Sequence, residues 1–351
     1  MTSIERVEAV LNHKIPDRIP VELHNFLMAC IMIGGNFRDT MRDGEALADM
    51  QLAAWREFGH DVIVHENGVC AEAEAMGCEI RYTPDLPPHV EVPVIQSLGD
   101  IDKLTVPDPE TTFPLNELLR ATRIIERETR GRVFINGRAD QGPVSLAMAL
   151  CGPENFLTAA MNPESKLHIL KLLDICTRMN VALGEAQCRA GAHSSTIGAS
   201  GTSLLSPSMY RELEFPGNVT FIRSMQRLGI RGGLHVCGKE DHLLDQLIET
   251  GADWIELDPA TNPALCKRVF QGRTSVFGML EPAHILGAGT TEEVREHTLD
   301  IMRTMAPGGH FIMGPGCALP PNTPPENIHT VMECARFEGV YAADGELPGL
   351  G

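Results

Sequence analysis

Residues 231–258, RGGLHVCGKEDHLLDQLIETGADWIELD, combine two short apolar runs with one amphipathic segment. The runs at 231–237 and 253–258 have the length and composition of buried β-strands. Between them, residues 241–250 carry leucine and isoleucine side chains at helical spacing, and Gly251 follows where a C-cap is expected. The stretch therefore predicts a strand, a helix and a second strand, which is the repeating unit of a parallel α/β fold.

The same kind of apolar run recurs along the whole chain. Including the two runs above there are eight, the others lying at 19–25, 61–66, 133–138, 195–200, 274–280 and 309–315. Amphipathic segments separate most of them, and eight alternating units favour closure into a (β/α)8 TIM barrel over an open sheet. We find no G-x-G-x-x-G after a strand and no P-loop pattern, so a dinucleotide-binding fold loses its main support.

Three segments have the Thr-x-x-Glu pattern of a capping box, which predicts a helix start. These segments are Thr2–Glu5, Thr290–Glu293 and Thr323–Glu326. In the last of them we expect Thr323 at the N-cap and Pro324 at the first helical position.

The spacing between the second and third runs is too long for one crossover helix, and residues 82–115 are rich in Pro and Asp. We therefore interpret 67–115 as an excursion packed on the barrel, within a single domain that spans 1–351. The tail at 341–351 is small and Gly-rich, and we expect it to fray.

Composition excludes several classes of partner. The chain has 43% hydrophobic residues and a formal net charge of −18, which argues against binding a nucleic acid or an anionic membrane surface. No run of 18 apolar residues occurs and the N-terminus does not resemble a signal peptide, so we expect a cytoplasmic protein. The ten cysteines are widely spread in apolar segments, as reduced thiols are.

The strongest chemical signal is His235-Val236-Cys237. Side chains two residues apart on a strand share a face, so both ligand atoms project together at the end of the fifth run. Cys317 follows the eighth run in Gly314-Pro315-Gly316-Cys317, where the glycines permit a close backbone approach to a bound group. One imidazole and two thiolates with an open fourth position form a catalytic zinc set. The His-x-Cys pair by itself also fits two buried core residues.

Other polar residues follow the strand ends and are expected at the same rim. Asp258 is a candidate for a displaceable fourth zinc ligand, for a partner of His235, or for a helix cap. We assign catalytic roles to Asp258, His65 and Asp140, and corrinoid or substrate contacts to Asn67, Gln141 and Met279. For each loop residue the alternative is that it satisfies nearby backbone groups.

The sequence resembles the uroporphyrinogen decarboxylase superfamily over nearly its whole length. The resemblance is carried by 234–238 (LHVCG), 314–320 (GPGCALP) and 323–328 (TPPENI), and more weakly by 72–78, 206–210 and 107–109. Within that superfamily it resembles the zinc-dependent corrinoid methyltransferases, of the methylcobalamin:coenzyme M type. True decarboxylases need N-terminal arginines to hold substrate carboxylates, whereas the first strand here contains Glu22 and no arginine.

The resemblance implies a TIM barrel in which His235, Cys237 and Cys317 hold Zn²⁺ and a thiol occupies the fourth position. It implies transfer of a methyl group between a corrinoid, as methylcobalamin or on a separate carrier protein, and a small acceptor such as coenzyme M. Zinc suits this chemistry because it keeps a thiol deprotonated and facing the methyl donor.

Four other interpretations share these ligands or this fold. The enzyme could run the opposite half-reaction, from an O-methyl, N-methyl or halomethyl compound to the corrinoid, or use a zinc thiolate to open an epoxide. A lyase acting on a tetrapyrrole would need arginines, for which Arg138 and Arg18 are the only nearby candidates. A zinc-stabilised barrel that only binds or carries a corrinoid would need four protein ligands.

Overall fold

The computed structural model describes residues 1–350, and eight parallel strands form its centre. They are β1 (Glu22–Leu23), β2 (Val62–His65), β5 (Phe134–Gln141), β6 (Ser194–Ala199), β7 (Arg231–Val236), β8 (Trp254–Leu257), β9 (Ser275–Leu280) and β10 (Phe311–Pro315). Each falls on one of the eight predicted runs. The strands are neighbours in this order, and a parallel bridge between Val21 and Met313 joins the last strand to the first. The predicted (β/α)8 barrel is confirmed.

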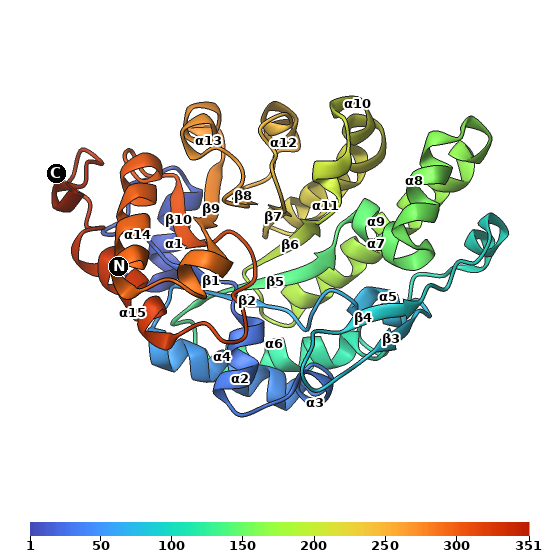
Figure 1. Ribbon diagram of the computed structural model, residues 1–351, viewed down its shortest axis with the longest axis horizontal. Helices are drawn as coiled ribbons and strands as arrows, with labels where there is room; N and C mark the ends of the chain where they lie inside the picture. The colour runs from blue at the N-terminus through green and yellow to red at the C-terminus, as the bar shows by residue number, and fades with distance from the viewer. Residues whose placement is uncertain (351) are drawn as a thin grey trace.

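Helices surround the strands, as Figure 1 shows. Those before the third barrel strand are α1 (Ser3–Leu11), α2 (Phe26–Met32), α3 (Phe37–Thr40), α4 (Gly44–Phe58), α5 (Ala71–Ala75) and α6 (Leu115–Thr129). Those that follow are α7 (Pro143–Cys151), α8 (Pro153–Met161), α9 (Lys166–Arg189), α10 (Pro207–Met209), α11 (Phe215–Arg227), α12 (Leu244–Glu249), α13 (Pro263–Phe270), α14 (Thr291–Met305) and α15 (Pro325–Phe337). No helix within residues 1–350 is long and apolar enough to cross a membrane.

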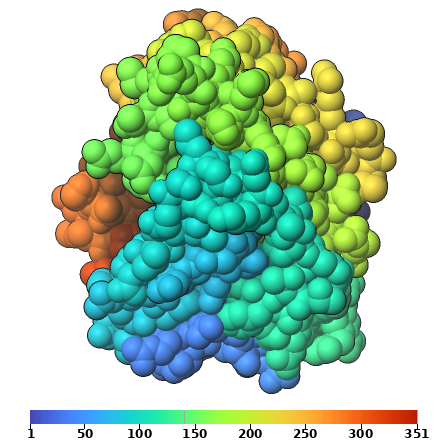
Figure 2. All heavy atoms as spheres, turned by 90° about the vertical axis from the view of Figure 1, so that its right-hand side faces the viewer, coloured from blue at the N-terminus to red at the C-terminus, as the bar shows by residue number. Residues whose placement is uncertain are grey.

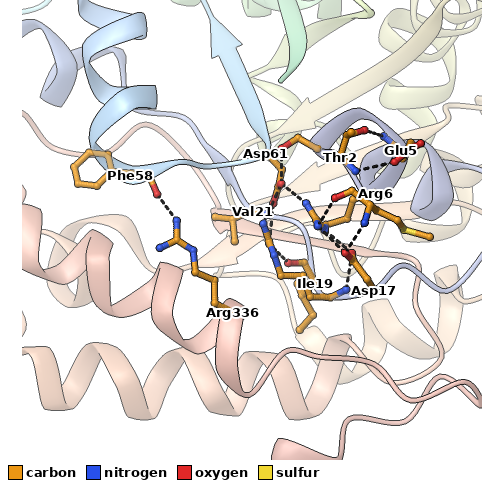
Figure 3. Close-up of polar contacts among 12 residues, drawn as sticks. Thr2, Glu5, Arg6, Asp17, Ile19, Val21, Phe58, Asp61 and Arg336 are labelled. Carbon is orange, nitrogen blue, oxygen red and sulfur yellow. Dashed lines mark hydrogen bonds and ion pairs between the residues drawn. The ribbon is translucent and has the colours of Figure 1, made fainter. Parts of the chain in front are cut away.

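Helix α1 is fixed to the barrel by both apolar and ionic contacts. The predicted capping box between Thr2 and Glu5 starts it, and its Val7 and Val10 join a small buried cluster with inward side chains of β2, β5, β8, β9 and β10. Arg6 donates to Asp61 at 2.7 Å and to Asp17 at 2.6 Å, as Figure 3 shows. Because Asp61 is fully buried, these contacts replace the water that its charge would otherwise need.

The excursion after β2 contains α5, a two-stranded hairpin and a short 3-10 helix. The hairpin pairs β3 (Glu79–Arg81) with β4 (His89–Val92) in antiparallel fashion, and the 3-10 helix is η1 (Leu98–Lys103). Figure 2 looks onto the right-hand side of Figure 1 and shows this segment, cyan to teal, across the middle of that face below α8. The backbone bond from Ile95 N–H to the Leu150 carbonyl ties the excursion to α7.

Two details of the C-terminal part differ from expectation. Helix α15 starts one residue later than predicted, with Pro324 at the N-cap, because the Thr323 hydroxyl donates to the Pro320 carbonyl instead of capping the helix. Residues 341–350, expected to fray, fold back: Tyr341 and Leu347 are buried in the main core, and the Tyr341 hydroxyl donates to the Ala306 carbonyl.

Candidate metal and substrate site

His235, Cys237 and Cys317 come together as the sequence predicted. His235 lies near the end of β7, Cys237 follows that strand directly, and Cys317 follows β10 by two residues. The His235 Nε2 atom is 2.9 Å from the Cys237 Sγ atom, and the two Sγ atoms are 3.9 Å apart. His235 is buried while both thiols are partly exposed, so the sulfur atoms are the accessible side of the cluster.

The distance between the two sulfur atoms fits a tetrahedral metal. Two thiolates on one zinc are expected about 3.8 Å apart from the usual Zn–S length, close to the 3.9 Å between Cys237 and Cys317. The imidazole and Cys237 are closer than the about 3.5 Å expected on zinc, which is the spacing of a direct hydrogen bond in its place. The Nδ1 atom of His235 is 3.0 Å from Glu256 Oε1, so a carboxylate lies at the position of the acidic partner in carboxylate–histidine–zinc triads.

A buried charge network lies behind the cluster. Glu256 contacts His24 at 3.3 Å and Arg138 at 3.2 Å, besides His235. Glu66 contacts the same two cations, at 3.1 Å from His24 and 2.7 Å from Arg138. All five side chains are at least nine-tenths buried. The arrangement pairs each buried charge, which is the condition under which ionised groups are tolerated in a protein interior.

The pKa values in this network follow from these pairs. Burial alone would raise the pKa of Glu66, but His24 and Arg138 lower it to about 2. Glu256 is likewise held well below its ordinary pKa by His235 and Arg138 against the cost of burial. Burial disfavours the charged form of His24, yet the Glu66 carboxylate raises its pKa well above the usual value. Both carboxylates are therefore ionised and His24 is protonated at neutral pH.

The two thiols share one proton unequally. The hydrogen bond from Cys237 is the largest cause that lowers the pKa of Cys317, to about 3, with further contributions from His235 and His24. The pKa of Cys237 is raised, first by this same hydrogen bond and then by burial. The site thus favours a thiolate at Cys317 before any metal binds, which suits a metal ligand.

Asp258 occupies a different place from the one expected. Its carboxylate accepts the N–H of Ala260 at 2.8 Å and so fixes the turn after β8. The partner of His235 is instead Glu256, which the β7–β8 register places directly beside it. The carboxylate thus stabilises its own turn, and it does not cap the next helix, α13, whose N-cap is Asn262.

His65 does not face the barrel mouth. Successive residues of a strand point to opposite sides, and the neighbouring Val64 belongs to the inner cluster. The His65 ring therefore points outward, where its Nε2 atom is 3.3 Å from the Leu118 carbonyl of α6. Burial lowers the pKa of His65 to about 4. The inward position belongs to Glu66, so the geometry gives no support to the expected catalytic role of His65.

The remaining predicted residues divide into three cases. Asn67 is buried directly after Glu66, and Gln141 is buried at the end of β5, where its backbone N–H donates to Glu72 at 3.3 Å. Met279 is fully buried in the main core with a φ of +72°, so it does not form part of an open surface. The side chain of Asp140 lies outside the part of the chain that the structure describes.

The sequence did not predict that Glu256, His24, Arg138 and Glu66 form one network, with Glu22 beside it, although Arg138 was considered as a group that could hold a substrate carboxylate. Glu22 is fully buried, and neither carboxylate oxygen has a hydrogen-bond partner within residues 1–350. Burial, and then Glu256, raise its pKa well above the ordinary value. The available signal was an unusual density of ionisable residues within strands that are otherwise apolar.

The two glycines before Cys317 serve the packing of the chain itself. A Cβ atom on Gly314 would lie 2.4 Å from Glu22 Oε1, and one on Gly316 would lie 2.5 Å from Pro259 Cδ. The backbone at both glycines must approach its neighbours closely, as predicted. These neighbours are the first strand and the turn after β8, and not a bound group.

Together, the fold and this cluster define a (β/α)8 barrel with an imidazole and two thiols at the carboxyl ends of its strands, the face on which barrel enzymes build active sites. A family model described as uroporphyrinogen decarboxylase (URO-D) matches residues 2–337. The chain belongs to this family.

Relatives within the family include enzymes of two kinds. The chain is 28% identical over 307 residues to methylcobamide:CoM methyltransferase MtbA of Methanosarcina acetivorans, covering 83% of this chain and 86% of that protein. It is 26% identical over 308 residues to uroporphyrinogen decarboxylase of Coxiella burnetii, covering 86% and 84%. The solved structure of a methyltransferase from Methanosarcina mazei shares the fold with a TM-score of 0.87 at 22% identity, covering 96% of this chain and 98% of that one.

Proposed function

We propose that this protein is a zinc-dependent methyltransferase that moves a methyl group from a corrinoid to a small thiol. The observation that carries the proposal is the His235, Cys237 and Cys317 cluster, whose donor atoms lie within 4.8 Å of one another with both sulfur atoms partly exposed. The methyltransferase relatives support it, because their names state methylcobamide and coenzyme M as substrates.

The chemistry requires a nucleophilic sulfur beside the methyl–cobalt bond. In the transfer, the sulfur–carbon bond forms as the cobalt–carbon bond breaks, both electrons stay on cobalt, and the thiol proton leaves to solvent. Zinc, when bound, would stabilise the substrate as a thiolate at neutral pH. The protein's own residues hold this arrangement: Glu256 orients His235, and Arg138 and His24 keep Glu256 ionised.

A decarboxylase acting on a carboxylated tetrapyrrole is less well supported by the site. Arg18 donates to Asp61 at 2.9 Å beneath α1, so it is committed to the opposite end of the barrel. Arg138 is buried and paired with Glu66 and Glu256. Neither guanidinium is placed to receive a substrate carboxylate.

We propose that the corrinoid arrives on a separate carrier protein or as free methylcobalamin that docks over the mouth of the barrel. The opposite half-reaction, from a methylated small molecule to the corrinoid, uses the same ligands and is the second candidate. The two candidate functions differ only in the direction of methyl transfer.

The test is anaerobic absorbance of methylcobalamin mixed with zinc-loaded protein and a panel of thiols. We expect thiol-dependent loss of the methyl–cobalt spectrum, and loss of both zinc and activity in Cys317→Ser. The matched control is Cys188→Ser, which changes a partly buried cysteine on α9 away from the cluster. Unchanged zinc content and rate in Cys317→Ser would refute the proposal. Methylation of cob(I)alamin by a methylated compound, with no response to thiols, would establish the opposite half-reaction.

A further inference from the structure

A pair of histidines lies at the amino ends of the barrel strands, on the face opposite the metal cluster. His13 follows the C-cap of α1, and His310 immediately precedes β10. These two elements lie side by side, as Figure 1 shows. Cys317 follows His310 by seven residues, which is roughly 20 Å along an extended chain. The histidine pair is therefore separate from the cluster that we propose to bind zinc.

The two rings of this pair face one another through the same ring nitrogen. The Nδ1 atoms of His13 and His310 are 2.6 Å apart, the ring centroids are 4.6 Å apart, and the ring planes are inclined by 43°. This Nδ1–Nδ1 distance is below the range of about 2.7–3.2 Å that is common for N–H···O hydrogen bonds. The pair thus either shares one proton tightly or offers two nitrogen ligands to a single ion.

The backbone holds both histidines in an uncommon conformation. His13 has a φ of +57° and His310 a φ of +66°, and within residues 1–350 two other non-glycine residues have a positive φ. This conformation is unfavourable for a residue with a Cβ atom, and it persists where the surrounding structure requires it. Gly308 and Gly309, each with a φ of +75°, lead the chain into His310. The chain therefore turns sharply on both sides to bring the two rings together.

The surroundings of the pair favour a neutral imidazole ligand. Burial, and then the neighbouring His13 and Lys267, lower the pKa of His310 to about 4, so its ring is uncharged at neutral pH. The Lys267 ammonium group donates to the carbonyls of Met305 and Pro307, at 2.8 and 2.5 Å. It is thereby directed toward the C-terminus of α14, where a cation is favoured. His13 is exposed, so an ion can reach the pair from solvent.

We propose that His13 and His310 bind a divalent late transition-metal ion, with Ni²⁺ and Cu²⁺ favoured over Zn²⁺ and with water in the remaining positions. Two nitrogen ligands at about 2.0–2.1 Å from a metal lie about 2.9 Å apart in square-planar or octahedral geometry, and about 3.4 Å apart in tetrahedral geometry. The observed 2.6 Å is nearer the first of these distances. Because His13 follows α1 and His310 precedes β10, a bound ion would link the first helix to the last barrel strand. This site is independent of the proposed methyltransferase function.

The experiment measures Ni²⁺ binding by calorimetry, with untagged protein that has first been incubated with zinc and freed of the excess. We expect one Ni²⁺ per chain in the wild type. In His13→Asn the affinity should be more than about tenfold lower, since loss of even an outer partner of a metal ligand costs that much. Asparagine is chosen because it tolerates a positive φ. The matched control His89→Asn, which changes an exposed histidine on β4, should bind Ni²⁺ like the wild type.

Two further measurements make the test independent of how well the variant folds. Ni²⁺ should raise the urea midpoint of the wild type, because an ion bound only by the folded state stabilises that state, and should leave the midpoint of His13→Asn unchanged. Pulsed electron paramagnetic resonance of the wild type with Cu²⁺ should detect two imidazoles on the ion. Absence of Ni²⁺ binding, equal binding by wild type and His13→Asn, or a single imidazole on Cu²⁺ would overturn the inference and leave a hydrogen-bonded histidine pair only.

Discussion

Replacing Glu256 by Gln should weaken zinc binding without removing a ligand. Glu256 lies 3.0 Å from the Nδ1 atom of His235 and also contacts His24 and Arg138. Glutamine keeps the volume of the side chain but removes the negative charge that raises the basicity of the His235 ring. It also leaves His24 and Arg138 with Glu66 as their one remaining carboxylate in this network. Loss of such an outer carboxylate typically costs 10–100-fold in metal affinity, which is about 1.4–2.7 kcal/mol.

The assay is anaerobic zinc competition against a chromophoric chelator, with urea unfolding of the same samples to confirm that each variant is folded. The matched control is Asp258→Asn, since the Asp258 carboxylate accepts a backbone N–H of its own turn. Its zinc affinity should stay within about twofold of the wild type, given the local role of the carboxylate. A folded Glu256→Gln protein with wild-type affinity, or a larger loss in Asp258→Asn, would show that the wrong carboxylate has been assigned to His235.

Three further predictions concern stability and local geometry. Asp61→Asn should lower the free energy of unfolding by about 3–5 kcal/mol, because Arg6 and Arg18 both lose a fully buried partner; urea unfolding checks this, and the exposed Asp17→Asn should cost less. Burial lowers the pKa of His65 to about 4 in the folded protein, whereas a histidine in the unfolded chain has a pKa of about 6.5. As the pH falls from about 6.5 toward 4, the unfolded chain is therefore protonated before the folded protein, and the folded state loses stability. Between pH 7 and 5 the wild type should therefore lose about 2 kcal/mol more than His65→Gln, and identical pH profiles would contradict the assignment. Gly316→Ala should lower zinc affinity several-fold, because its Cβ would lie 2.5 Å from Pro259 and displace the segment that carries Cys317, whereas Gly99→Ala meets only Ser97 Oγ at 3.9 Å and should have no effect.

The strands were predictable because each is a short apolar run between turn signals, and parallel pairing then determines which ends share a rim. The proximity of the three candidate ligands followed from this argument, since His235 and Cys237 share a face and Cys317 follows the last strand. The capping boxes at Thr2 and Thr290 were equally local, and both are present.

The charge network was not predictable in the same way. A shift of one position along a strand reverses which side chains point into the barrel. The boundary of the second apolar run did not show whether His65 or Glu66 points inward. The pairing of His235 with Glu256 depends on the register between β7 and β8, which a single sequence does not contain. Asp258 lies two residues after Glu256 and would point to the same side if the strand continued. However, β8 ends at Leu257, and the chain turns before the Asp258 carboxylate can reach the His235 ring.

The closure of the barrel has a consequence for how the chain folds. β1 spans only Glu22–Leu23, and the last strand meets this first segment through the bridge between Val21 and Met313, almost three hundred residues apart. Contacts of such long sequence separation form late, because the entropy of a large loop must be lost before they contribute. Cys317 follows that last strand, so the third donor atom joins His235 and Cys237 only when the seam closes. A metal ion held by all three side chains would therefore link the two ends of the closed barrel, and we expect the metal-free protein to open first between β1 and β10.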